Sequence, residues 1–99
     1  MALYKLTTAA DADLDQIWRY TNDTWGARQA DIYLDKMFAC LDRIGRGLAV
    51  RQRYPDVPPD LIAHRCADHI IFWLERAEPR IVAILSSRTD LTRRLSTRL

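Results

Sequence analysis

The segment Asp68–Ser87, DHIIFWLERAEPRIVAILSS, decides the fold of this 99-residue chain. Two runs rich in β-branched and aromatic residues, His69–Glu75 and Ile81–Leu85, predict two strands joined by a short charged turn. Pro79 lacks a backbone N–H, so the residues between the runs cannot all continue a strand ladder. Both runs are apolar at odd-numbered and at even-numbered positions, which a strand directs to opposite faces. Both faces of the hairpin therefore need a cover.

The composition fits one small domain over residues 1–99. Apolar residues make up 48% of the chain, which is enough for a core. No run approaches the ~18 apolar residues of a membrane span, and the N-terminal sequence lacks the apolar centre of a secretory signal. The two cysteines, Cys40 and Cys66, do not have CxxC spacing. We therefore expect reduced thiols in a cytoplasmic protein.

Charge is distributed unevenly, although the net charge is only +2. Residues 1–42 contain seven acidic and four basic side chains, whereas residues 43–65 contain two acidic and five basic ones. Residues 88–99 contain four arginines and one aspartate. The basic surplus indicates an acidic partner surface or nucleic acid, with solvated arginines that have no partner as the alternative.

An amphipathic helix is predicted near the N-terminus. Apolar residues recur at helical spacing from Ala10 to about Asn22. Thr8 is the expected N-cap, and Asp11 should return a hydrogen bond as in a capping box. Negative charge near the positive end of the helix dipole gives a structural rather than a metal-binding role to three aspartates, Asp11, Asp13 and Asp15.

A second, longer helix is predicted over Ala27–Gly45. One of its faces is a continuous apolar stripe and the opposite face is charged. Gly26 allows a tight reversal, so the two helices should pack antiparallel as a hairpin. A DNA-reading helix-turn-helix is disfavoured, because acidic residues follow Arg28 and Gln29 at the start of the second helix. Direct sequence-specific binding of nucleic acid is therefore not expected.

Short elements complete the expected sheet. Leu3–Leu6 and Leu61–Cys66 are strand candidates, the proline-rich segment Leu48–Asp60 is an irregular loop, and Leu91–Leu99 is a short helical tail. This order predicts an α+β, β-α-α-β-β-β two-layer domain with the helical hairpin packed on one face of a small, mostly antiparallel sheet. The second apolar face would remain open to bind another polypeptide.

Several short motifs occur in an order that is typical of one protein family. The first half contains an Ala-x-x-Asp-Leu-x-x-Ile-x-x-Tyr helix starting at Ala10, a Trp-Gly turn, and a Gln-Ala-x-x-Tyr motif ending at Tyr33. The second half contains Arg65, an aromatic run starting at His69, and Ile-Leu followed by Asp-Leu. In this order and spacing, nearly the whole chain resembles the ParE toxins of the RelE/ParE superfamily.

The resemblance implies the toxin of a bacterial type II toxin–antitoxin system. Such a toxin is held inactive by a cognate ParD-like antitoxin, whose C-terminal segment folds as it wraps the toxin. ParE toxins are associated with inhibition of DNA gyrase, growth arrest and stress responses, whereas RelE-like relatives cleave messenger RNA on the ribosome. The resemblance implies no cofactor and no metal.

The residue types favour gyrase binding over ribosome-dependent cleavage. Cleavage needs groups that move protons, but the tail from Arg88 onward contains no Tyr, His, Lys or Glu. Where RelE-like relatives often carry Arg and His, this chain has Ala83 and Ser86. His69 matches a structural histidine of the family, which leaves His64 and Arg88 as weak catalytic candidates. We therefore expect an inhibitor without chemistry of its own, with the endoribonuclease as the open alternative.

The predicted binding residues form two groups. An amphipathic antitoxin segment laid in a groove should meet the acidic first half and the open sheet face. The candidate antitoxin-binding residues, for which simple packing is the alternative, are Trp18, Tyr20, Trp25, Tyr33, Phe72 and Leu74. The candidate contacts to gyrase or gyrase-bound DNA are Arg65, Arg88, Arg93, Arg94 and Arg98.

Overall fold

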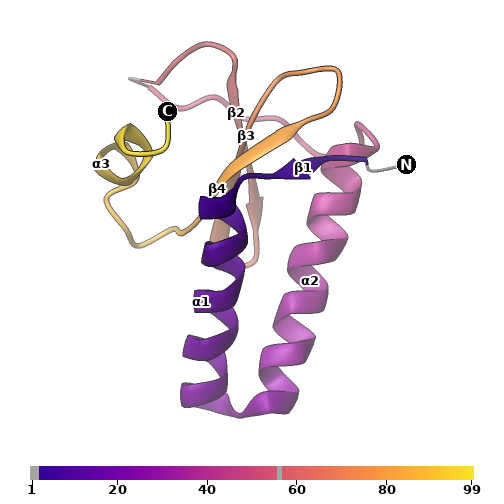
Figure 1. Cartoon of the computed structure of the whole chain (residues 1–99), viewed down its shortest axis with the longest axis vertical. Coiled ribbons are helices and arrows are strands. Elements are labelled where there is room, and N and C mark those ends of the chain that lie inside the picture. Colours follow the sequence, from indigo (N-terminus) through magenta and orange to yellow (C-terminus); the bar gives the residue numbers. More distant parts are fainter. Residues whose placement is uncertain (1–2, 56) are drawn as a thin grey trace.

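A computed structural model describes residues 3–55 and 57–99, so Asp56 in the expected loop lies outside the described residues. The elements follow the predicted α+β order and end in a short helix (Figure 1). Their bounds are β1 Lys5–Leu6, α1 Thr8–Trp25, α2 Ala27–Gly45, β2 Leu61–Cys66, β3 His69–Leu74, β4 Arg80–Ser86 and α3 Leu91–Ser96.

The described residues form a four-stranded sheet in the order β1-β4-β3-β2. β3 pairs antiparallel with both β2 and β4, and β1 joins the outer side of β4 as a parallel neighbour. The expected loop before β2 contributes an isolated antiparallel bridge between Gln52 and Ala63. The prediction of a small, mostly antiparallel sheet is confirmed.

The helical hairpin covers one face of the sheet and extends beyond it (Figure 1). Apolar residues from α1, α2 and the facing side of the sheet form one core cluster. Its buried members are Ala10, Leu14, Ile17, Met37, Leu41, Ile44, Ile62, Cys66, Ile71, Trp73, Ile81 and Ile84. The periodic apolar stripes therefore pack where the sequence predicted.

The first helix differs from the prediction at both ends. Its N-cap is Thr7, whose Oγ1 accepts a hydrogen bond from the Ala10 N–H at 3.1 Å, so the predicted capping box starting at Thr8 is wrong. α1 also continues beyond Asn22 to Trp25. Gly26 then ends α1 and begins α2 with a φ of 94°, a conformation that favours glycine.

The close approach of the N-terminal segment to α2 depends on Gly45. A Cβ atom at this position would lie 2.5 Å from Leu3 Cβ and 2.8 Å from the Leu3 carbonyl oxygen. A side chain at position 45 would clash with Leu3. Glycine at the last position of α2 therefore lets the N-terminal segment pass close to α2 before it enters β1.

The second face of the sheet is closed by the chain itself, so the prediction of an open face is wrong. Leu95 of α3 is only 1% exposed, and Tyr54 and Val57 of the loop pack against the same cluster. The Tyr54 and Phe72 rings meet edge to face, with their centroids 5.4 Å apart. The buried members of the cluster are Leu61, Ala63, Ile70, Phe72, Val82, Ala83, Leu85 and Leu95.

A bulge changes which side chains of β4 face the helices. Phe72 pairs with Ala83 but Trp73 pairs with Ile81, so Val82 is an extra residue in β4. Ile81 consequently packs on the helix side, whereas Ala83 packs on the tail side. The expectation that odd-numbered and even-numbered residues lie on opposite faces of the sheet therefore holds in β3 and is wrong in β4.

A disulfide joins Cys40 of α2 to Cys66 at the end of β2. The two Cα atoms are 6.4 Å apart, although the cysteines are separated by 26 residues in the sequence. The expectation of two reduced thiols is wrong, because packing of α2 on the sheet brings the pair together. The bond fixes α2 to the outer strand β2.

Candidate functional site

A groove with a volume of about 700 Å³ runs along the helical hairpin to the end of the sheet. α1 and α2 contribute residues from their shared surface, while β3, β4 and α3 contribute residues at the far end. The groove combines exposed apolar side chains near the turn between the helices with charged side chains near the sheet.

The apolar end lies where the hairpin extends past the sheet. Tyr20 is 70% exposed, Trp25 is 71% exposed and Ile32 is 42% exposed, and all three line the groove. These side chains have no sheet to pack against, because this part of the hairpin projects from the body of the molecule (Figure 1). Large aromatic groups left exposed in a groove are typical of binding surfaces.

Tyr33 and His69 form a fixed polar contact in the middle of the groove. The Tyr33 hydroxyl oxygen accepts from the Asp68 backbone N–H at 3.2 Å and lies 2.6 Å from His69 Nδ1. We assign the hydroxyl proton to the bond with Nδ1, which places the His69 proton on Nε2. Burial lowers the pKa of His69 and raises the pKa of Tyr33, so both side chains are held neutral.

Three cationic side chains, Lys36, Arg88 and Arg94, line the end of the groove near the sheet. They come from α2, from the segment after β4 and from α3. Within the described ranges 3–55 and 57–99, none of the three belongs to an ion pair. Their charges are therefore available to a partner.

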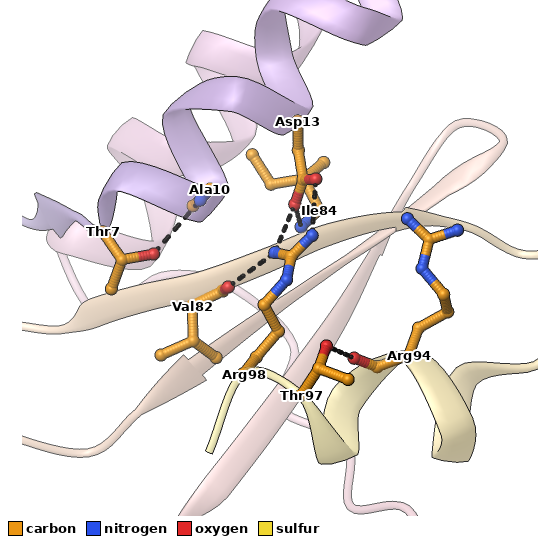
Figure 2. A network of polar contacts seen from close by, with 8 residues as sticks. All are labelled: Thr7, Ala10, Asp13, Val82, Ile84, Arg94, Thr97 and Arg98. Atoms are coloured by element: carbon orange, nitrogen blue, oxygen red, sulfur yellow. Dashed lines mark hydrogen bonds and ion pairs between the residues drawn. The ribbon is translucent and has the colours of Figure 1, made fainter.

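A buried ion pair connects α1 to the C-terminal tail (Figure 2). The Arg98 guanidinium donates to both carboxylate oxygens of Asp13, each at 2.8 Å. Asp13 also accepts from the Ile84 N–H at 2.9 Å, and Arg98 donates to the Val82 carbonyl oxygen at 3.0 Å. The hydrogen bond to Asp13 raises the pKa of Arg98. The side chain of Arg98, a candidate target contact, is thus held inside the protein.

The structure separates the six candidate antitoxin residues. Tyr20, Trp25 and Tyr33 line the groove and so lie on one surface. The remaining three do not line it. Trp18 donates its indole N–H to Asp31 at 2.9 Å, whereas Phe72 and Leu74 lie in the cluster beneath the tail.

The five candidate target arginines also have different environments. Arg88 and Arg94 line the groove, and Arg98 is committed to Asp13. Arg65 is exposed on β2, where its Nε donates to the Ala67 carbonyl oxygen at 3.1 Å. Arg93 is exposed on α3.

The two weak catalytic candidates do not share a site. His64 lies on β2 with Nδ1 2.9 Å from the Val50 carbonyl oxygen and does not line the groove, whereas Arg88 does. No potential metal site of three or more His, Cys, Asp or Glu side chains is found in the part of the chain that the structure describes. Among the described helices, none is long and apolar enough to cross a membrane.

The groove residues that sequence reasoning missed include Ile32 and Lys36 of α2. Both belong to a second face of α2, which Gln29 and Tyr33 complete at helical spacing. This helical spacing was the signal by which the sequence could have revealed the groove, but the stronger apolar stripe of α2 obscured it.

The fold is shared with a protein of known structure from a toxin–antitoxin system. A chain in a structure described as the chromosomal ParDE TA system from P. aeruginosa superposes with a TM-score of 0.69 and 17% sequence identity. The match covers 85% of this chain and 96% of that one. The two chains therefore belong to one class of small α+β fold.

Sequence comparison identifies the family. Residues 4–91 match the family of ParE toxins of the type II toxin–antitoxin system parDE. Toxin ParE of Escherichia coli is 42% identical over 101 residues, covering 100% of this chain and 98% of the relative. Toxin ParE1 of Mycobacterium tuberculosis H37Rv is 31% identical over 94 residues, with 93% and 96% covered. The chain belongs to the ParE toxin family, and the resemblance read from its motifs is confirmed.

Proposed function

We propose that this ParE family member arrests bacterial growth by binding and inhibiting DNA gyrase, without catalytic residues of its own. The environment of His69 carries the main support, because its Nδ1 is engaged by Tyr33 and the groove carries the three cations Lys36, Arg88 and Arg94. Of the two carboxylates that line the groove, Asp13 is held by Arg98. Lysine and arginine side chains bind anions but are poor general bases at neutral pH. The groove therefore favours binding over chemistry.

The proposed contact with gyrase or its bound DNA involves the basic second half of the chain. Arg65 and Arg93 are exposed, while Arg88 and Arg94 line the groove. We leave Arg98 out of this surface, because removing its guanidinium from Asp13 would break a buried ion pair.

We propose that a ParD-like antitoxin neutralises the toxin by lying in the groove as an amphipathic segment. Tyr20, Trp25 and Tyr33 are its expected contacts. Phe72 and Leu74, which the sequence also suggested, belong to the face that the tail covers, so we restrict the antitoxin contact to the groove.

Gyrase inhibition places the protein in the cytoplasm, where gyrase acts on the chromosome. The Cys40–Cys66 disulfide removes the support that reduced cysteines were expected to give this localisation. The proposed localisation therefore rests on family membership and on the proposed target.

A supercoiling assay with purified toxin and purified gyrase tests the proposal. We expect loss of supercoiling and accumulation of cleaved DNA complexes, both prevented by the co-purified antitoxin. Unchanged supercoiling at toxin concentrations that stop growth would refute gyrase as the target. Messenger RNA cuts in the ribosomal A site, lost on His64→Ala, would instead support the endoribonuclease.

A further inference from the structure

The disulfide between α2 and β2 is a feature of this chain that the proposed function does not use. We propose that it is a thiol-exchange site, at which a small anionic thiol attacks Cys40 and releases Cys66. The product is a mixed disulfide on Cys40, which makes this cysteine a site of reversible modification. The exchange does not depend on which target the toxin binds.

The two cysteines differ in how easily a dissolved thiol can reach them. Cys66 lies at the end of β2 in the core cluster beneath the helices and is only 4% exposed. Cys40 packs at the border of the same cluster and is partly exposed on α2. A thiolate can displace only a sulfur that it can reach, so attack is directed to Cys40 and Cys66 is the leaving group.

Two cations flank Cys40 on the surface of α2. Lys36 precedes it by four residues and Arg43 follows it by three, spacings that place side chains next to one another on a helix. Both cations are exposed, and among the described residues neither belongs to an ion pair. Asp68 of the adjoining turn, which lines the groove together with Lys36, supplies an opposing charge. The local surplus of positive charge raises the concentration of an anionic thiol beside the bond.

The exchange balances without an outside oxidant. The attacking thiolate forms a bond to Cys40 Sγ, and the electron pair of the old bond leaves on Cys66 Sγ, which takes up the proton that the incoming thiol gave up. A second molecule of the thiol then attacks the mixed disulfide at the sulfur of the small molecule. This step releases the small-molecule disulfide and leaves a thiol on Cys40. Two small thiols are thereby oxidised while one protein disulfide is reduced.

The structure already contains a hydrogen-bond acceptor for the released Cys66 thiol. Cys66 Sγ lies 3.5 Å from the Lys36 carbonyl oxygen. A disulfide sulfur has no proton to donate, so this contact becomes a weak S–H···O hydrogen bond only after the exchange. The Cys66 thiol therefore stays beside α2, where it can form the bond again.

Other contacts hold the end of β2 in place once the bond is open. The Asp68 N–H donates to the Tyr33 hydroxyl oxygen at 3.2 Å, and the Ser87 N–H donates to the Asp68 carbonyl oxygen at 3.0 Å. These hydrogen bonds fix the turn after Cys66 to α2 and to the segment after β4. The chain can therefore exchange thiols while it remains folded.

A reversible bond suits a reducing compartment. Disulfides of cytoplasmic proteins are usually transient or redox-sensing, because the thiol pool of the cytoplasm keeps other cysteines reduced. In the proposed cytoplasmic location, the small-thiol pool would determine how firmly α2 is fixed to β2.

The direction of attack is tested on the wild-type chain with reduced glutathione, a small anionic thiol. The oxidised protein is exposed to glutathione, free thiols are blocked at early times with N-ethylmaleimide, and the cysteine peptides are identified by mass spectrometry. We expect glutathione on Cys40 and maleimide on Cys66, with the reverse arrangement about tenfold rarer or less. Equal amounts of the two arrangements, or a majority of glutathione on Cys66, would overturn the assignment. A disulfide that stays intact would overturn the exchange itself.

Charge variants test the two cations. Lys36→Gln/Arg43→Gln should slow the attack of glutathione by about fivefold. Attack by cysteamine, whose ammonium group cancels the charge of its thiolate, should stay within about twofold of wild type. The matched control is Arg28→Gln, which removes an exposed charge from the start of the same helix and should affect neither thiol. An unchanged rate with glutathione, equal slowing of both thiols, or slowing by the control would overturn the role of the cations.

Reversibility is tested by removing glutathione from the modified chain. The Cys66 thiol should displace glutathione from Cys40, so the adduct should disappear and the protein disulfide should return. The control is Cys66→Ala carrying glutathione on Cys40, which lacks the displacing thiol and should keep the adduct. Equal persistence of the adduct in the two proteins would overturn reversible exchange in the folded chain.

Discussion

The two faces of the sheet are closed by very different means. One is covered by α1 and α2, helices of 18 and 19 residues, and is cross-linked by a disulfide. The other is covered by an irregular loop and by the six-residue α3, with Leu95 buried and Arg98 tied to Asp13. The first face depends on many repeated contacts, whereas the second depends on a few side chains. Single substitutions should therefore reveal the difference.

The largest effect is expected from Asp13→Ala. This change leaves the Arg98 guanidinium without its counter-ion and the Ile84 N–H without its acceptor, which should cost about 3–5 kcal/mol of unfolding free energy. Urea denaturation measures the loss. Asp15→Ala, an exposed position on the same helix, is the control and should change stability by less than about 0.5 kcal/mol. Similar losses at the two positions would contradict the ion pair's role.

Loss of the disulfide should be the next largest effect, and it acts on the helix-covered face. Cys40→Ser opens a loop of 26 residues and should cost about 3 kcal/mol. Thermal unfolding with and without reductant measures this cost. Reduced wild type should resemble the variant, whereas the variant should not respond to reductant. Two titratable thiols in the folded, non-reduced protein would show that the bond does not form.

Leu95→Ala should cost less, about 2 kcal/mol, because a six-residue helix can move to fill part of the cavity. The buried Leu41 of α2 provides the comparison, since Leu41→Ala should cost more in the rigid helical layer. Hydrogen exchange distinguishes the faces further. Leu95→Ala should speed exchange in α3 and leave α1 and α2 protected, and general loss of protection would contradict a local role.

The smallest effect is a pH dependence that originates on the helix-covered face. Burial keeps the pKa of folded His69 below its ordinary value of 6.5, so the unfolded chain binds the proton more readily. The stabilising contribution is present above pH 6.5 and is lost as the pH falls through the lower folded-state pKa. An NMR titration of the His69 ring measures this pKa, and a value at or above 6.5 would contradict the burial effect.

The helix-covered face was largely predictable because its signals are periodic. The bounds of α2, Ala27–Gly45, and of β2, Leu61–Cys66, agree with those read from the sequence. The apolar stripes extend over several turns, so each helix is specified by many residues at once. The errors on this face are the Thr7 cap, the bulge at Val82 and the Cys40–Cys66 disulfide, which was expected to be two reduced thiols.

The tail-covered face and the groove could not be predicted to the same degree, because their contacts join distant positions. Asp13 and Arg98 are separated by 85 residues, and neither position signals the other. The exposed aromatic residues Tyr20 and Trp25 were identified, but Lys36 was not. Which side chains share a groove depends on how the hairpin sits on the sheet, a tertiary property that local patterns do not encode.

The Asp13–Arg98 pair has a further consequence for self-association. β1 pairs with β4 only through Arg80 and Ile81 in the described chain, so beyond Ile81 no strand covers that margin of β4. Side chains satisfy the backbone groups of this margin instead. Asp13 accepts a hydrogen bond from the Ile84 N–H, and Arg98 donates one to the Val82 carbonyl oxygen. A strand from another molecule would have to break a buried ion pair to add there, so the pair disfavours strand addition along this margin of β4.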